Sequence, residues 1–433
     1  MVKINKDPKI QNSIIKIVGL LEEKQGLEFS LTANGYLREK FSDEHSNFFK
    51  DYFYPDFRNL MFFNHSRINN RRFKKNIDQT ISLSDSHKKE EFIVNDAEVL
   101  LFGGDYIALF CVSIQAKKEN LDINRVSNLL YLIRQFDTVT ENNTKWCHWI
   151  EDELLGGIKI RGRGVSVDEY SGTKFKLFSV IDLQNEIEDE ERMKLLYDIG
   201  TSSPIGSSGN LKSSFSPHQD YYTSIIENKL SVFVNWEALS LLDTFTVIGH
   251  NIIMEPKQYN TWSFTYFRIY LFRVFFKYNL YRYNSLMSNE DDNSIALRSK
   301  FEEFLNIFDT YPISYNFLPN EIFQNIDKGL NVQFELSNFH NRITRMTEAI
   351  KEKKQAQMNL LLELISVITA VTSAAAIPTI IEQVNIISGI PAIIYFAFLA
   401  IIGIILLVIF SRFLKPVQKL KSLHKIILRK KSK

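Results

Sequence analysis

The stretch LLLELISVITAVTSAAAIPTII, residues 360–381, decides the expected fold. It is 22 residues long, and a second apolar stretch, IPAIIYFAFLAIIGIILLVIF, occupies the 21 residues of 390–410. An α-helix rises about 1.5 Å per residue, so about 20 apolar residues cross the roughly 30 Å of bilayer hydrocarbon. Both stretches reach that length. We therefore expect two C-terminal transmembrane helices joined by a short outer loop at 382–389.

The charges on either side of these stretches indicate their orientation. Five basic residues precede the first stretch, and the tail 411–433 carries nine Lys or Arg and no acid, whereas the loop 382–389 has no basic residue. Basic flanks stay on the cytoplasmic side. We expect a multi-pass protein of the inner (cytoplasmic) membrane, with both termini and most of the chain in the cytoplasm. The alternative is a buried hydrophobic hairpin in a soluble protein.

Composition limits the partners of the chain. The 433 residues have a net charge of +2, so with nine basic residues in the tail the rest of the chain sums to −7. A basic tail after an apolar stretch is suited to anionic lipid headgroups. An acidic body makes direct binding of nucleic acid the weaker hypothesis.

The first apolar stretch carries a polar stripe that the second lacks. Its members are spaced 4, 3, 3 and 4 residues apart, which places them on one face of a helix; they are Asn359, Glu363, Ser366, Thr369 and Ser373. A carboxylate in a membrane normally faces a bundle interior or water. We expect these residues to line a pore between self-associated copies. Alternatively, the hydroxyl groups bond their own backbone and Glu363 reaches the headgroups.

A long helix is expected before the membrane. Apolar residues recur at alternating spacings of 4 and 3, a heptad pattern; they are Val332, Leu336, Phe339, Ile343, Met346 and Ile350. We expect one helix from about residue 321 to 377, roughly 85 Å long at 1.5 Å per residue. Residues 321–359 of it would form a stalk. The alternative is a helix packed within the body.

The first 200 residues are expected to form a cytoplasmic α/β domain. EVLLFGGDYIALFCVSI (98–114) is typical of two strands around a Gly-Gly-Asp turn, and KFKLFSVIDL (174–183) of another strand. RVSNLLYLIRQF (125–136) is typical of a short helix. A Ser/Gly-rich loop follows at 201–215.

Residues 216–320 are expected to be a helical cytoplasmic region. Ser216, Pro217 and Gln219 have the pattern of a helix cap and capping box, so we expect a helix to begin there and to run to about residue 245. The segment 259–283 contains twelve aromatic and four basic residues. We expect a core helix whose basic side chains extend to solvent. Stacking on a bound base and lying on a membrane surface are the alternatives.

The order of these parts resembles the CorA-type divalent-cation channel superfamily. The shared features are an α+β cytoplasmic domain followed by a helical bundle, a long stalk helix, two C-terminal transmembrane helices and a basic tail. The resemblance implies a homopentamer whose first membrane helix lines the pore. The family's Gly-Met-Asn signature is absent, since residues 377–385 read IPTIIEQVN. A subgroup of CorA-like membrane effectors accompanies type III CRISPR antiviral defence and responds to a nucleotide second messenger, a conjugate of S-adenosylmethionine with AMP.

These observations favour an oligomeric ion channel gated from its cytoplasmic domain, and not an enzyme. No GxxxxGK[ST], GxSxG or HExxH motif is present, and the two cysteines form no paired motif. A nucleotide ligand would suit Arg161 and Arg163, whose guanidinium groups match phosphate. Ser216, His218 and Asp220 would face it from a helix N-terminus. The alternatives are a magnesium or other divalent-metal transporter, with the cation as ligand, and a non-conducting membrane-anchored binding module.

Overall fold

The structure of the chain is a computed structural model. It describes residues 8–21, 26–39, 41, 43–63, 68, 70–103, 106–117, 122–160, 174–210, 213–289 and 294–383. The chain divides into two compact units, Met1–Ile343 and Thr344–Lys433, and each is considered by itself.

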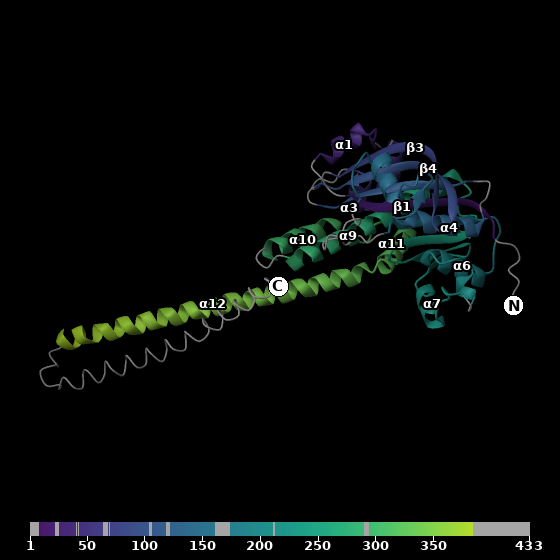
Figure 1. Cartoon of the computed structure of the whole chain (residues 1–433). Helices are drawn as coiled ribbons and strands as arrows, with labels where there is room; N and C mark the ends of the chain where they lie inside the picture. Colours follow the sequence, from purple (N-terminus) through teal and green to yellow (C-terminus); the bar gives the residue numbers. More distant parts are fainter. Residues whose placement is uncertain are drawn as a thin grey trace. The chain divides into compact units, whose positions relative to one another are not determined.

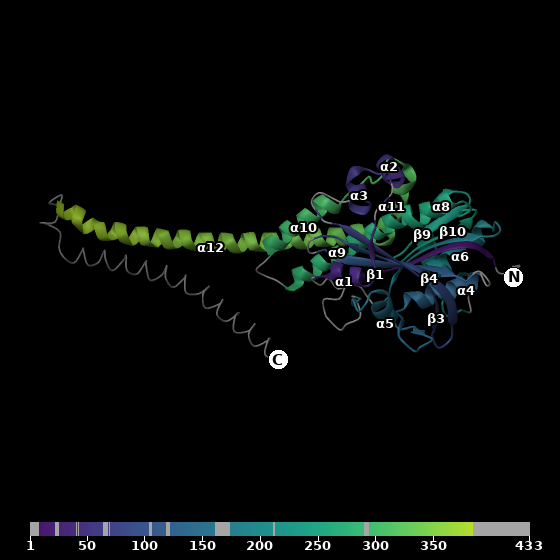
Figure 2. The ribbon, with the colours of Figure 1, turned by 90° about the horizontal axis from the view of Figure 1, so that it is seen from above.

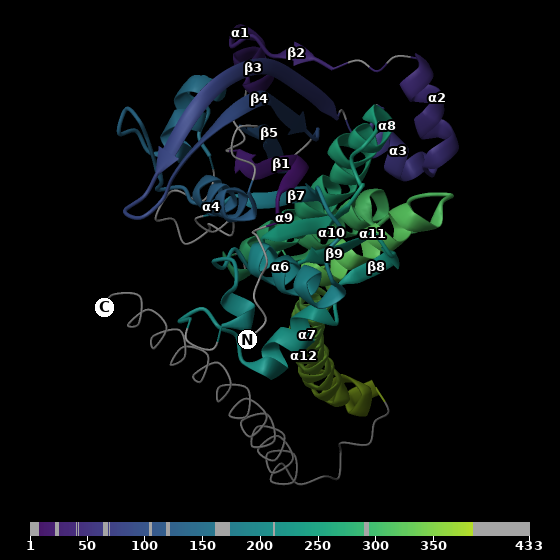
Figure 3. The same ribbon diagram turned by 90° about the vertical axis from the view of Figure 1, so that its right-hand side faces the viewer.

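The first unit is built around a mixed sheet of ten strands. They are β1 (Ile10–Leu21), β2 (Leu37–Arg38), β3 (Arg71–Ser84), β4 (Lys89–Leu101), β5 (Ala108–Ala116), β6 (Val139–Thr140), β7 (Lys176–Leu183), β8 (Leu230–Phe233), β9 (Trp236–Ser240) and β10 (Thr244–His250). Their order is β2-β3-β4-β5-β1-β7-β10-β9-β8, with β6 beside β3 (Figure 3). All pairs are antiparallel except β7 with β10.

The described residues also form helices. They are α1 (Leu27–Ala33), α2 (Asp43–Tyr52), α3 (Pro55–Met61), α4 (Ile123–Arg134), α5 (Trp146–Trp149), η2 (Ile150–Leu154), α6 (Asp189–Thr201), η3 (Ser207–Gly209), α7 (Gln219–Ile226), α8 (Pro256–Asn260), η4 (Thr261–Tyr266), α9 (Phe267–Asn289), α10 (Ser294–Phe308), α11 (Phe317–Gly329) and α12 (Val332–Gln383). Figures 1 and 2 show α10 and α11 beside α9, against which both pack.

Both faces of the central strands are buried because each face has its own helical cover. Successive side chains of a strand point to opposite faces. In β7, Leu177 and Ile181 belong to the apolar cluster that includes α4, whereas Phe178 packs its ring on Phe267 and Tyr270 of α9. The strands therefore have long apolar runs without a polar face, as is typical of a sheet covered on both sides.

Several expected elements are confirmed. Residues 98–114 contain the end of β4 and most of β5, which pair antiparallel, and 174–183 contain β7. The helix expected at 125–136 is α4, whose N-cap Asp122 accepts a hydrogen bond from the Arg125 N–H at 2.9 Å. In the Ser/Gly-rich segment, the buried carboxylate of Asp198 holds the chain by accepting the N–H groups of Gly206 and Ser208.

The helix expected to run from Ser216 to about residue 245 is wrong. Only α7 is helical there, and the chain then forms β8, β9 and β10 at one side of the sheet. Every residue of β9 is buried, and Glu237 is neutralised there by Arg192 at 3.2 Å and by Lys229. Tertiary pairing of this charge allows a strand where the local sequence suggested a helix.

The continuous helix expected over 321–377 is also wrong, since it is divided into α11 and α12. Gly329 ends α11, Leu330 follows, and Asn331 takes a left-handed conformation with φ of 57° before α12 starts at Val332. Asparagine is among the residues that adopt this conformation most readily. We call residues 330–331 the joint. The helix α12 then continues without a break from the first unit into the second.

The prediction of two C-terminal transmembrane helices is contradicted by the described structure. Among the helices of the described residues, none has the length and apolar character needed to cross a membrane. The expected second helix at 390–410 and the basic tail at 411–433 lie outside the described residues.

Candidate functional site

The residues expected to bind a ligand are not brought together by the described structure. Arg161 and Arg163 lie outside the described residues. His218, not Ser216, caps α7: its Nδ1 accepts the Asp220 N–H at 3.4 Å. The His218 and Asp220 side chains are also within 3.6 Å of each other and are 80% and 92% exposed. The sequence pattern therefore predicted the cap of this helix two residues too early, at Ser216 instead of His218.

The expected pore-lining residues lie along α12, and all five side chains are exposed there. The hydroxyl groups of Ser366 and Thr369 donate hydrogen bonds to carbonyl oxygens of their own helix, at 2.9 and 2.8 Å. This is the arrangement that the alternative hypothesis described for these two residues. Pore lining itself stays a prediction.

The unexpected feature is the burial of basic residues in α9. Arg268, Arg273 and Lys277 are 0%, 1% and 4% exposed, so the expectation that their charged groups reach solvent is wrong. The helix packs on Phe178 of β7 through Phe267 and Tyr270, and against α10 and α11, which leaves these three side chains little exposed surface. A buried charge is costly unless it is paired.

Arg268 is neutralised by a buried ion network with β4. Its guanidinium pairs with Glu98, which Lys16 approaches to 3.8 Å, and lies 4.8 Å from the ring of Phe264. Burial would raise the pKa of Glu98, but the charges of Arg268 and Lys16 outweigh it and hold that pKa at about 2. This carboxylate remains ionised, and the network ties α9 to the centre of the sheet.

Arg273 occupies a different environment. Its guanidinium pairs with Asp327 of α11 and lies between the rings of Phe276 and Phe323, 4.5 Å from each ring centroid. Its Nε and Nη1 atoms are buried without a hydrogen-bond acceptor among the described residues. Burial lowers the pKa of Arg273, and the charges of Asp327 and Asp309 oppose that effect. A buried cation with unused donors is a candidate ligand contact.

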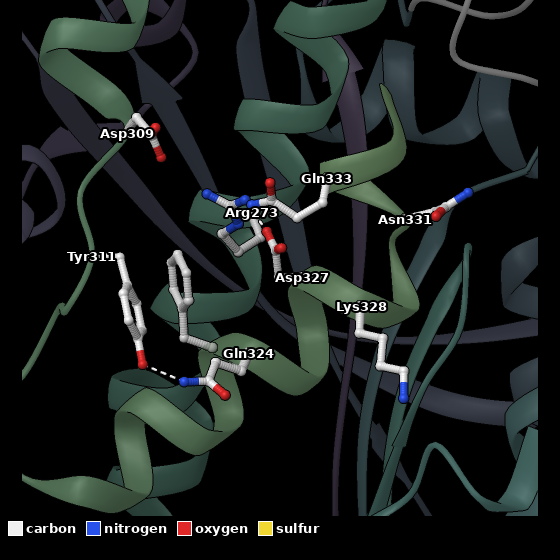
Figure 4. A pocket seen from close by; sticks show the side chains of 9 residues that line it. Arg273, Asp309, Tyr311, Gln324, Asp327, Lys328, Asn331 and Gln333 are labelled. Atoms are coloured by element: carbon white, nitrogen blue, oxygen red, sulfur yellow. Dashed lines mark hydrogen bonds and ion pairs between the residues drawn. The ribbon is translucent and has the colours of Figure 1, made fainter. Parts of the chain in front are cut away.

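A cavity of about 400 Å³ opens at this arginine (Figure 4). Its lining comes from α9, α11, the start of α12 and the segment after α10; the residues are Arg273, Asp309, Tyr311, Phe323, Gln324, Asp327, Lys328, Asn331 and Gln333. Arg273, Phe323 and Asp327 are its buried members, and Asp309, Tyr311 and Lys328 are exposed. The volume lies in the range of small-molecule sites, roughly 300–1,000 Å³.

The cavity includes the joint between α11 and α12. Asp327 and Lys328 are in the last turn of α11, Asn331 is in the joint, and Gln333 is in the first turn of α12. The backbone N–H groups at a helix start have no partner within the helix and carry partial positive charge. A ligand in this cavity would therefore contact both helices and Asn331 of the joint.

The cavity lining contains neither a cysteine nor a histidine. No group of three His, Cys, Asp or Glu suitable for a metal ion occurs among the described residues. Both cysteines are buried, and burial raises the pKa of the Cys111 thiol well above its ordinary value, which disfavours the nucleophilic thiolate. The Arg273 cavity is the site that we consider further.

Comparison with known proteins gives no match: no protein-family description, no curated protein and no solved structure is similar to this chain at a significant level. The resemblance to CorA-type channels therefore stays a prediction from the order of the sequence features.

Proposed function

We propose that this chain is a non-catalytic ligand receptor, in which a small molecule bound at Arg273 alters the joint between α11 and α12. The observation that carries the proposal is a cavity lined by a buried, ion-paired arginine and by residues on both sides of the joint. The charged groups of the cavity lining are Arg273, Lys328, Asp309 and Asp327, which suit binding of a charged ligand.

The joint is suited to respond to a ligand. Only two residues separate α11 from α12, and Asn331 holds a left-handed conformation, which is a backbone basin separate from the helical one on either side of it. The Leu330 N–H still bonds the Ile326 carbonyl at 2.8 Å, whereas the Glu335 N–H reaches the Asn331 carbonyl at a longer 3.3 Å. A ligand that contacts Asp327 and Gln333 together would favour one geometry of the joint over others.

The response would be carried by α12. Large apolar side chains are exposed along it in the described structure, and several lie between 358 and 368; they include Met358, Leu361, Leu362, Ile365 and Ile368. A helix that is apolar around its circumference is normally covered. We propose that further copies of the chain, next to a lipid bilayer, cover it. Self-association and the lipid partner are both extensions of the sequence predictions.

Binding to the full-length protein tests the proposal. AMP and the conjugate of S-adenosylmethionine with AMP are the probes that the CorA-like resemblance suggests, and adenosine is the uncharged control. A receptor should be stabilised against heat by the ligand, because binding to the folded state alone raises stability. Hydrogen exchange should slow in the peptide that covers residues 327–336.

A double variant provides the matched test. Arg273→Met with Asp327→Leu removes both members of the buried ion pair, so neither charge is left without its partner. Arg298→Met with Glu302→Leu is the control, because it removes an exposed ion pair of α10 whose charged atoms are 2.7 Å apart. Loss of ligand protection only in the first variant would support the proposal. Equal protection in both would exclude Arg273 from the site.

Ion conduction and metal transport stay predictions of the sequence. They are measured by ion flux into vesicles that contain the purified chain, with Mg²⁺ and K⁺ compared. Flux that depends on the ligand would favour the gated channel, whereas Mg²⁺ flux without ligand would favour the transporter.

A further inference from the structure

The charges that line the Arg273 cavity are balanced. Arg273 and Lys328 contribute two positive charges, and Asp309 and Asp327 contribute two negative charges. Figure 4 shows Asp309 and Tyr311 on one side of the cavity and Lys328 and Asn331 on the other, with Arg273 and Asp327 between them. One side of the cavity is therefore negative, at Asp309, and the other is positive, at Lys328. The ion pair of Arg273 and Asp327 lies between them.

This distribution discriminates between ligands of different charge. A simple anion that approaches Arg273 also approaches two carboxylates, and a simple cation meets two basic groups. Like charges that are brought together destabilise a complex. A ligand that carries both charges can place each beside its opposite.

We infer that the cavity binds a zwitterion of the α-amino-acid class, with its carboxylate at Arg273 and its ammonium group toward Asp309. The inference rests on the proposed function, because it names the ligand class of the same site. An amino-acid head group fills only part of about 400 Å³, so the side chain of the ligand would extend along Tyr311 and Phe323. The ring centroids of these two residues are 5.6 Å apart and their planes are inclined by 29°, and the two rings provide an apolar wall.

Each of the twenty L-amino acids, added singly to the full-length protein, provides the first test. We expect at least one with a large apolar or aromatic side chain to raise the melting temperature. The N-acetyl form of that amino acid, which lacks the positive charge, and its methyl ester, which lacks the negative charge, should both bind less well. Inorganic phosphate serves as the simple anion.

The variant Asp309→Asn gives the sharper test because the sign of its effect differs between ligand classes. Asp309 is exposed, so the substitution should not disturb folding, and Glu303→Gln on the exposed face of α10 is the matched control. For a zwitterion, removing Asp309 should weaken binding about three- to fivefold, as expected for a partly exposed charge pair. For a simple anion, the same change should strengthen binding.

Three outcomes would overturn the inference. They are tighter binding by Asp309→Asn than by the unchanged protein, equal binding of the N-acetyl form and the free amino acid, and the absence of any effect of the twenty amino acids. If phosphate or AMP binds in these cases and requires Arg273, the receptor function stands and only the ligand class is wrong. If no probe binds, the proposed function fails as well.

Discussion

Removing the carboxylate of Asp327 should destabilise the protein far more than an exposed charge change. The Arg273 side chain is 1% exposed and that of Asp327 11%, and aromatic rings cover both faces of the guanidinium. Asp327→Ala therefore leaves a buried cation without its counter-charge, which typically costs about 3–5 kcal/mol. Solvent screening reduces this little, because both side chains are buried.

The double variant Arg273→Met with Asp327→Leu should recover most of that loss. Apolar groups of similar volume can replace a buried ion pair with little net change in stability, so we expect it within about 1–2 kcal/mol of the unchanged protein. Urea unfolding followed by circular dichroism compares the unchanged protein, Asp327→Ala and the double variant. A cost below about 1 kcal/mol for Asp327→Ala would mean that the Arg273 guanidinium reaches water.

Three further predictions concern other parts of the chain. Gly329→Ala should lower the free energy of unfolding by about 1–3 kcal/mol, because a Cβ there would overlap the backbone carbonyl of Ser240 in β9. Gly209→Ala is the control: its Cβ would meet only a lysine side chain, at 3.8 Å, so the same urea titration should show almost no change. Burial lowers the pKa of Lys277 to about 8, and the positive charge of Lys176 adds to this effect. Between pH 8 and the ordinary lysine pKa of 10.5, Lys277 is protonated in the unfolded state but mostly neutral in the folded state. The free energy of unfolding should therefore rise with pH in this range, by up to about 1.4 kcal/mol per pH unit. Lys277→Met should remove this rise, and an unchanged slope in pH-dependent unfolding would contradict it. Leu361→Lys should weaken self-association measured by light scattering if α12 is covered by other copies, and an unchanged mass would exclude that face from the contact.

The sequence was most informative where local pattern and tertiary environment agree. The paired strands β4 and β5 were predictable because apolar residues surround a Gly-Gly-Asp turn, and α4 because its apolar residues have helical spacing. These segments carry their own signals, and packing only reinforces them. The same holds for β7, a short apolar run between polar segments.

The sequence misled where distant residues decide the structure. β9 contains Glu237, which is tolerated in a buried strand only because Arg192 and Lys229 meet it there. Likewise Arg273 and Asp327 are 54 residues apart, and nothing in the spacing of either indicates the pair. The sequence did contain one signal for the site: arginines occur within the aromatic segment 259–283. A basic residue that is surrounded by apolar residues needs a buried partner.

The most direct test of the receptor proposal is hydrogen exchange of the full-length protein with and without the amino acid that stabilises it best. A ligand at the joint should slow exchange in the peptide covering residues 327–336, and should cause no such change in the Arg273→Met with Asp327→Leu variant. Stabilisation accompanied by protection only elsewhere, for example around His218 at the start of α7, would contradict a site at the joint and place the ligand away from it.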